Sequence, residues 1–201
     1  MIKLNLGCGG RPIKGFINID FDNLKKMKKR YPDAKIPKGM IIKNFNIFKL
    51  PYKSETVDLV RADSLIEHLS FFEEKKFFLE VKRVLKKGGI CNISTPDFEK
   101  TVKLWLKLKD NWQDFYKNDS DSIKKVHWFG TYTYKPTNRW GYITATLFGS
   151  QNGKGQYHKN CYTKKKLRSI FHRIGFKCIS VKNFKWLKER DHMIRVVAKK
   201  I

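Results

Sequence analysis

Short apolar runs, separated by polar and turn-forming residues, alternate along the first third of the chain. Residues 2–6, 16–19, 40–43 and 57–62 each have the length and apolar content of a short strand. The polar stretch LPYKSET separates the last of these runs from the one before it. The pattern therefore predicts four strands before residue 63.

A helix with clear end signals follows. Ser70 and Glu73 form a capping-box pattern, and apolar residues then recur at helical spacing as far as Leu85. Gly88 and Gly89 are expected to end this helix, because glycine readily adopts the left-handed conformation that closes helices.

A fifth strand is expected over residues 90–94, with Pro96 ending it. Asp97 has the position of a cap for a second helix over residues 98–108. Its spacing predicts three inward-facing residues, which are Val102, Trp105 and Leu106.

The last third of the chain contains one more helix and two strands. Thr163 is the expected cap, Gly175 closes the helix, and apolar runs follow over residues 177–181 and 194–198. Strands that alternate with helices indicate the α/β class, here a single domain over residues 1–201 with a doubly wound, mainly parallel sheet of seven strands.

The segment between the second and third predicted helices has no regular period. Residues 109–160 are rich in tryptophan, tyrosine and phenylalanine among glycines and polar residues. A connection of this length is usually functional or disordered, and the density of aromatic residues argues against disorder. We expect an aromatic-rich insertion after strand five, over about residues 98–160.

The net charge of the chain suggests nucleic acid or an anionic surface as a partner, and the sequence leaves this question open. The chain has 44 Lys and Arg against 18 Asp and Glu, a formal net charge of +26, which favours binding to nucleic acid or anionic surfaces. Most of the excess is lysine, and lysine, asparagine, isoleucine, phenylalanine and tyrosine share AT-rich codons, so genome composition explains the same numbers. Nucleic acid remains a candidate partner on this evidence.

Other classes of protein are disfavoured by what the chain lacks. No run approaches the ~20 apolar residues of a membrane span, and the glycine-rich turn begins too early to leave room for a leader peptide. The four cysteines show no ligand spacing, so we expect free thiols, no metal site and a cytoplasmic location.

The stretch LNLGCGG carries the first chemical signal. Gly7, Gly9 and Gly10 follow a strand directly, and without Cβ atoms they let a ligand approach the backbone closely. Asp20 ends the second strand, where a carboxylate can accept both hydroxyl protons of a ribose. Pro12 stands where a dinucleotide site needs its third glycine, which argues against a pyrophosphate ligand.

These pieces resemble the class I S-adenosylmethionine (SAM)-dependent methyltransferases, in particular the type 11 pattern. LNLGCGG is similar to the family's first motif, and GFINID to its second strand with the terminal acid. NFNIFKLPYKSETVDLVRADSLIEHLS, FLEVKRVLKKGGICNISTPD and HKNCYTKKKLRSIFHRIGF resemble its later elements in the same order. The resemblance covers about residues 2–97 and 157–199.

The resemblance implies a Rossmann-like methyltransferase fold and SAM as the cofactor. Asn46 would accept a hydrogen bond from adenine where the family usually has Asp, and Arg11 would pair with the methionine carboxylate or an anionic acceptor. The full set of implied cofactor residues is Asn5, Gly7, Cys8, Gly9, Gly10, Arg11, Asp20, Asn46, Ile47, Ala62, Asp63 and Ser64.

Two histidines in or beside the aromatic segment are the candidate catalytic residues. His158, which belongs to the family's late element, and His127 are each placed to take a proton from an acceptor hydroxyl. A satisfied structural histidine remains the alternative for both. Glu67 and His68 are interpreted as structural.

Sequence motifs that the chain lacks exclude some classes of methyl acceptor. The chain has ADSL after strand four instead of the Asp/Asn-Pro-Pro-aromatic tetrapeptide of adenine N6 enzymes, and no cysteine follows a proline. The first hypothesis is methylation of an O or N atom in a small-molecule or sugar-type acceptor. An RNA- or protein-directed methyltransferase and a SAM-binding protein without turnover remain alternatives, and the sequence leaves the oligomeric state open.

Overall fold

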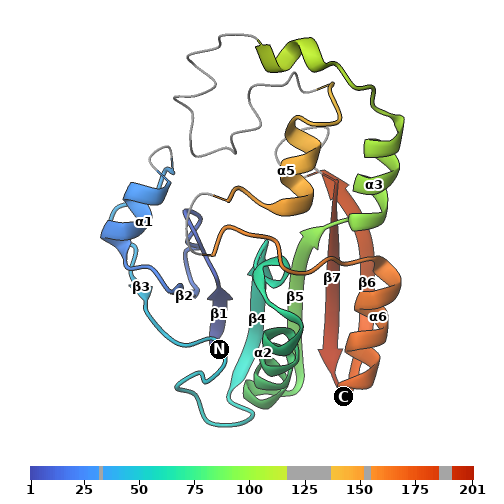
Figure 1. The fold of residues 1–201 in the computed structure, drawn as a ribbon. Helices are drawn as coiled ribbons and strands as arrows, with labels where there is room; N and C mark the ends of the chain where they lie inside the picture. The colour runs from blue at the N-terminus through green and yellow to red at the C-terminus, as the bar shows by residue number, and fades with distance from the viewer. Residues whose placement is uncertain (32–33, 117–136, 152–154, 186–191) are drawn as a thin grey trace.

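The structure is a computed structural model that describes residues 1–31, 34–116, 137–151, 155–185 and 192–201. Its strands form one seven-stranded sheet in the order β3-β2-β1-β4-β5-β7-β6 (Figure 1). Their bounds are β1 Lys3–Leu6, β2 Ile17–Ile19, β3 Ile42–Lys43, β4 Val57–Asp63, β5 Leu85–Pro96, β6 Phe176–Lys185 and β7 His192–Lys200. Within this sheet β7 runs antiparallel to both of its neighbours. The expected α/β fold class is confirmed.

The helical elements connect these strands. They are α1 Leu24–Arg30, η1 Ile66–His68, α2 Phe71–Val84, α3 Phe98–Lys107, η2 Trp112–Tyr116, α5 Tyr142–Phe148 and α6 Lys164–Arg173. The predicted caps are present: Ser70 and Glu73 complete a capping box at α2, and the Thr163 hydroxyl accepts from the Lys166 N–H at α6. No described helix has the length and apolar character needed to cross a bilayer.

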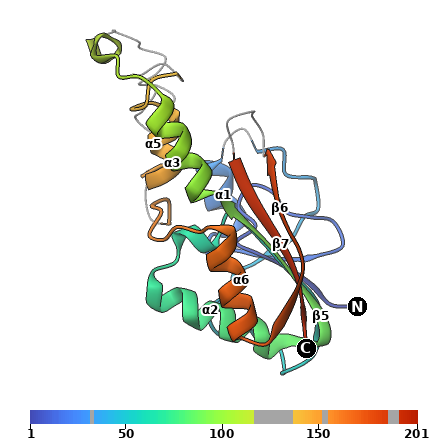
Figure 2. The same cartoon turned by 90° about the vertical axis from the view of Figure 1, so that its right-hand side faces the viewer.

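The main core lies between the sheet and helices α2 and α6, which share one face of it (Figure 2). Leu4, Val60, Cys91 and Ala198 lie in register across four strands and are fully buried. Burying an aliphatic side chain of this size contributes about 1.5–3 kcal/mol relative to exposure, so rows of this kind fix the strand register.

Residues that alternate onto the opposite face of the sheet are more polar. Asn5, Arg61 and Asn92 are in register there, and the Asp63 carboxylate bonds the Arg61 guanidinium and the Ser94 hydroxyl. Because successive strand residues point to opposite faces, one face supplies the core while the other holds hydrogen-bonded polar groups.

The structure corrects the expected end of helix α2. The helix ends at Val84, and β5 starts at Leu85, which pairs with Val57. Gly88 and Gly89 lie inside the strand, where the register shifts between Val57 and Leu59. The glycines therefore form an irregularity of the sheet and do not end the helix.

Helix α3 also differs from its prediction. Val102 and Trp105 are partly buried as expected, but Leu106 is 63% exposed and Leu104 is partly buried. The helix projects beyond the end of the sheet (Figure 2), so only a narrow part of its surface meets other residues. The prediction for Leu106 was wrong because it assumed that all apolar positions of this helix face a core.

The carboxyl ends of β1, β2, β4 and β5 lie at one edge of the sheet, the upper edge in Figure 1. Helices α3 and α5 lie beyond this edge, so the part of the predicted insertion that the structure describes stands over the strand ends. Ligands of open α/β sheets bind at such an edge.

Candidate functional site

The turn after β1 needs glycine for two separate reasons. Gly7 has a φ of +61°, and a Cβ atom there would lie 2.6 Å from Cδ1 of Leu65. Gly9 has a φ of +50°, and the atoms nearest to a Cβ there belong to Tyr31, at 3.8 Å and beyond. The turn is thus tightly packed against Leu65 at Gly7 and in ordinary contact with Tyr31 at Gly9.

Asp20 closes this turn from the end of β2. One carboxylate oxygen accepts from the Gly9 N–H at 2.9 Å and the other from the Asp22 N–H at 3.1 Å. The side chain is 6% exposed. These hydrogen bonds hold the carboxylate beside the glycine turn, at the carboxyl end of β2.

Asn5, in β1, makes a hydrogen bond to the backbone of the loop that follows the glycine turn. Its amide donates to Oδ1 of Asn18, which also accepts from the Ile13 N–H, and to the carbonyl of Arg11. Asn5 and Asn18 are both buried. Asn5 therefore holds the backbone from Arg11 to Ile13 in place, whereas the sequence suggested a direct cofactor contact.

Cys8 lies in the turn as a buried thiol. Its N–H donates to the carbonyl of Ile19, which joins the turn to β2. Burial, followed by the negative charge of Asp20, raises the pKa of Cys8 to about 12. The side chain is a protonated structural group at neutral pH.

The candidate adenine residues lie in the turn after β3. Asn46 is exposed, and its Oδ1 accepts from the Phe48 N–H at 2.9 Å, as in an Asx turn. Ile47 is partly buried and packs against the core.

The residues that end β4 face different surroundings. Ala62 is fully buried on the face that α2 and α6 cover. The Asp63 carboxylate faces the opposite side, where Arg195 lies 3.5 Å away in addition to Arg61. Ser64 has a φ of +50°, an unusual conformation for a residue other than glycine, and such strain gathers at functional sites.

Two contacts near the glycine turn were not predicted from the sequence. Tyr31 follows α1, with its ring beside Gly9 and Gly10, and its hydroxyl accepts from the Gln156 amide at 3.3 Å. Gly155 lies against Phe21, which is 52% exposed. Residues 155–156 therefore lie close to the glycine turn that follows β1. This contact joins segments that are far apart in the sequence, so local sequence patterns do not reveal it.

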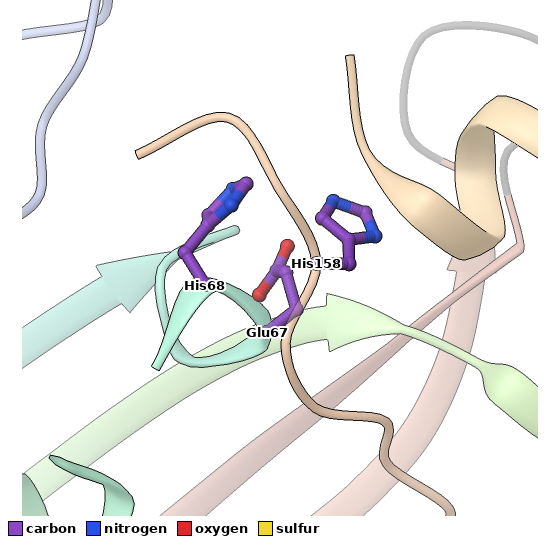
Figure 3. Close-up of side chains that lie close together, drawn as sticks. All are labelled: Glu67, His68 and His158. Atoms are coloured by element: carbon purple, nitrogen blue, oxygen red, sulfur yellow. The ribbon is translucent and has the colours of Figure 1, made fainter. Parts of the chain in front are cut away.

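A second group of polar side chains lies just past β4. Glu67 and His68 come from η1, and His158 comes from the segment before α6 (Figure 3). The two imidazoles meet edge to face, with ring centroids 4.8 Å apart, and one potential ligand atom from each of the three residues lies within 4.8 Å of the others (Figure 3). The interpretation of Glu67 and His68 as merely structural did not foresee that they meet His158.

Burial governs the protonation of this group. It raises the pKa of Glu67 to about 8, although hydrogen bonds from its own N–H, from Thr95 and from Ser64 act in the opposite direction. Burial lowers the pKa of His68, and burial with the neighbouring His68 lowers that of His158 to about 3. Both imidazoles are neutral at pH 7.

Comparison with known proteins shows which family the segment around the glycine turn resembles. Residues 4–93 match the family model described as a methyltransferase domain. Over 83 residues the chain is 34% identical to a protein of Mycolicibacterium smegmatis named as a probable S-adenosylmethionine-dependent methyltransferase. This alignment covers 40% of the present chain and 29% of the relative, so the chain spans less than a third of that relative's length.

The match to the methyltransferase-domain model spans residues 4–93, somewhat less than half of the 201-residue chain. The resemblance to SAM-dependent methyltransferases of type 11 is thereby confirmed for this part of the chain. The matched segment contains the glycine turn, Asp20, and the end of β4.

Solved structures extend the likeness of the methyltransferase fold over the whole chain. One is a Methanosarcina mazei SAM-dependent methyltransferase, with a TM-score of 0.56 and 15% identity, covering 99% of this chain and 92% of that one. Another is the Burkholderia thailandensis 1,6-didemethyltoxoflavin-N1-methyltransferase, with bound 1,6-didemethyltoxoflavin and S-adenosylhomocysteine. Its TM-score is 0.57 at 10% identity, and the match covers 99% of this chain and 70% of that one. At such identities these matches support the fold.

Outside the matched segment, aromatic residues cluster beyond the end of β5. Trp140 stacks on Trp112 and meets the edge of Trp105, and the Arg139 guanidinium lies 4.7 Å from the Trp105 ring centroid. The expected aromatic cluster is therefore present after β5. His127 lies outside the residues that the structure describes, so its predicted role stays a prediction.

The late segment is fixed directly onto η1. The N–H groups of Lys159 and Asn160 both donate to the carbonyl of Glu67, and the Tyr162 hydroxyl donates to the carbonyl of Ile66. These hydrogen bonds fix the segment after His158 to η1, which explains how Glu67 and His158, far apart in the sequence, lie close together.

Proposed function

We propose that the protein is a SAM-dependent methyltransferase that methylates an O or N atom of a small-molecule or sugar-type acceptor. The observation that carries the proposal is the pairing of Gly9 with Asp20 at the carboxyl ends of β1 and β2. This pairing lies inside the segment that matches the methyltransferase family.

The residues present fit the adenosine part of SAM. In this proposal the Asp20 carboxylate accepts from the ribose hydroxyls, and the nucleoside lies beside the backbone of Gly9. In this proposal Asn46 and Ile47 flank the adenine, while Arg11 and residues 62–64 hold the methionine end. The strained backbone of Ser64 supports that placement.

SAM supplies an electrophilic methyl group on a positively charged sulfur. The acceptor atom forms a bond to the methyl carbon while the carbon–sulfur bond breaks, and the acceptor proton passes to a base or to water. His158 is the candidate partner for that proton. Its pKa of about 3 makes it a weak base at neutral pH, so its expected contribution is to accept a hydrogen bond and orient the acceptor.

The acceptor site is proposed to lie under α3 and α5, beside the cluster of Trp105, Trp112 and Trp140. Small organic ligands favour concave sites lined by aromatic residues with a few polar groups. The Burkholderia enzyme, which shares the fold, binds a small aromatic acceptor.

An RNA-directed enzyme is the second candidate, because the net charge of +26 favours polyanions. Incubation with SAM labelled in its methyl group, followed by fractionation of a cell extract into small molecules, RNA and protein, separates the two. Label in the small-molecule fraction is expected. Label confined to RNA or protein, or binding of SAM without any transfer, would contradict the proposed acceptor class.

The variant Asp20→Asn tests the cofactor site directly. Loss of the carboxylate charge should weaken SAM binding by about 1.5–3 kcal/mol, roughly ten- to hundredfold, since charged acceptors form the stronger hydrogen bonds. Titration calorimetry with SAM measures the effect. Asp58→Asn is the matched control, because Asp58 lies near the start of β4, at the opposite end from the strand's carboxyl end, and pairs with Lys86. Equal affinities in both variants would refute the ribose assignment.

A further inference from the structure

Glu67, His68 and His158 combine one carboxylate with two imidazoles in a small space. One potential ligand atom from each residue lies within 4.8 Å of the other two. The carboxylate is almost fully buried, with 2% exposure, and the two histidines are partly buried. Figure 3 shows that all three side chains point into the same region. This composition equals the two-histidine, one-carboxylate set that binds divalent transition metals.

Both imidazoles are held so that the same nitrogen remains available. Nδ1 of His68 lies 3.0 Å from the carbonyl oxygen of Tyr157, and Nδ1 of His158 lies 2.9 Å from that of Thr146. A carbonyl oxygen only accepts, so Nδ1 carries the proton in each ring and Nε2 carries the lone pair. Metal-binding histidines are commonly oriented in this way, by a carbonyl on the opposite ring nitrogen.

Glu67 has the outer contacts of a metal-binding carboxylate. The Thr95 hydroxyl donates to its Oε2 at 3.0 Å, which fixes the side chain. In the part of the chain that the structure covers, no lysine or arginine forms an ion pair with Glu67, and the nearby Lys159 ammonium pairs with Glu73. A divalent ion would supply the positive charge that an ionised carboxylate needs at this depth.

We propose that Glu67, His68 and His158 bind one divalent transition-metal ion of the zinc class. The ligand atoms of a tetrahedral zinc ion lie about 3.4 Å apart, given bond lengths near 2.1 Å. The potential ligand atoms lie within 4.8 Å of one another, so a bound ion would have to draw them closer to reach that spacing. Three protein ligands would leave one position of a tetrahedral ion open.

The chemistry of the ligands also selects among ions. Imidazole nitrogen favours Zn²⁺, Co²⁺ and Ni²⁺, whereas Mg²⁺ and Ca²⁺ prefer oxygen ligands. The ion and an acceptor hydroxyl would compete for the same Nε2 lone pair of His158. The inference concerns binding alone and does not rest on methyl transfer.

The test is titration of the tag-free, metal-depleted protein with Co²⁺, followed by visible absorption, and then displacement by Zn²⁺. We expect one equivalent of bound Co²⁺ with the absorption of nitrogen and oxygen ligands, and no response to Mg²⁺. Glu67→Gln and His158→Gln should each weaken binding by about tenfold or more. His172→Gln removes an exposed histidine of α6, and Cys161→Ser removes the exposed thiol near the site, so both should bind as the natural chain does.

Unchanged Co²⁺ affinity in His158→Gln, or loss of the spectrum in Cys161→Ser, would overturn the proposal. A variant that does not fold is replaced by a measurement on the natural chain. Diethylpyrocarbonate modifies unliganded histidines, and mass spectrometry locates the products. Zn²⁺ should protect His68 and His158 but not His172, and equal modification with and without Zn²⁺ would refute the site.

Discussion

At the scale of single residues, Gly7 shows how the turn combines two constraints. Its positive φ excludes most side chains, and the Leu65 side chain occupies the position of its missing Cβ. Gly15 has a φ of +79°, and no atom lies within 4 Å of the point that a Cβ would occupy there, so it has the first constraint alone. Substitutions at Gly7 and Gly15 therefore distinguish the cost of backbone strain from the cost of a steric contact.

We expect Gly15→Ala to lower the free energy of unfolding by about 1–2 kcal/mol, the cost of a left-handed conformation with a Cβ. Gly7→Ala should cost about 1–3 kcal/mol more, because Leu65 must move. Urea unfolding measures both values. In a Leu65→Ala background the additional cost of Gly7→Ala should largely disappear, and equal costs for the two glycines would contradict the role of Leu65.

The cysteines provide a pH test. A pKa raised to about 12 means that Cys8 carries less thiolate at any given pH than an ordinary cysteine, and burial also raises the pKa of Cys91. Cys161 is exposed. At about pH 8, iodoacetamide should modify Cys161 in the folded protein and reach Cys8 and Cys91 only after denaturation. Mass spectrometry of the peptides decides, and alkylation of native Cys8 at that pH would show that the turn opens.

Residue patterns singled out the glycine turn and Asp20, which the structure brings into contact. The glycine turn and Asp20 are close in sequence, so local spacing and strand position sufficed to suggest them. The meeting of Glu67 with His158 depends on the late segment lying across η1, with 89 positions between His68 and its partner Tyr157. No local pattern contains that information.

At the scale of elements, the seven strands were predicted because their apolar runs are bounded by clear turn residues. Helix α1 was missed because, within LKKMKKR, only Leu24 and Met27 are apolar. Helix α5 was missed because it has Gly141 at its start without a capping side chain. Short helices with weak caps derive their stability from tertiary contacts, such as the full burial of Met27, rather than from local sequence.

The late segment depends on Asn160 as a connecting residue. Its amide nitrogen donates to the Glu74 carboxylate and the Tyr162 hydroxyl, while its oxygen accepts from the Lys166 ammonium. Asn160→Ala removes these three hydrogen bonds at a residue that is 8% exposed, so we expect a loss of about 2–3 kcal/mol in the free energy of unfolding, measured with urea.

Lys159→Ala is the control for this prediction, since it removes the neighbouring side chain. Its ion pair with Glu73 spans 3.3 Å, and the lysine side chain is 49% exposed, so the expected cost is below about 1 kcal/mol. If Lys159→Ala cost as much as Asn160→Ala, the surface ion pair rather than the buried amide would fix the segment.

At the scale of the whole molecule, the excess of positive charge opposes folding. A net charge of +26 on 201 residues produces self-repulsion in the compact state, and the ion pairs of the described residues are mostly at the surface. Repulsion acts over long distances, whereas each surface pair contributes about 0–1 kcal/mol at short range.

Moderate salt should therefore stabilise the protein. Raising NaCl from about 0.01 M to about 0.15 M shortens the screening length from about 30 Å to about 8 Å, which removes long-range repulsion while sparing short, partly buried pairs. We expect the midpoint of thermal unfolding to rise over this range, and KCl to act equally, because the effect depends on ionic strength. Calorimetry measures it, with sulfate avoided because it also strengthens apolar burial. A falling midpoint would mean that close ion pairs, such as those of Lys200 with Glu55 and Arg83 with Glu80, outweigh the repulsion between lysines.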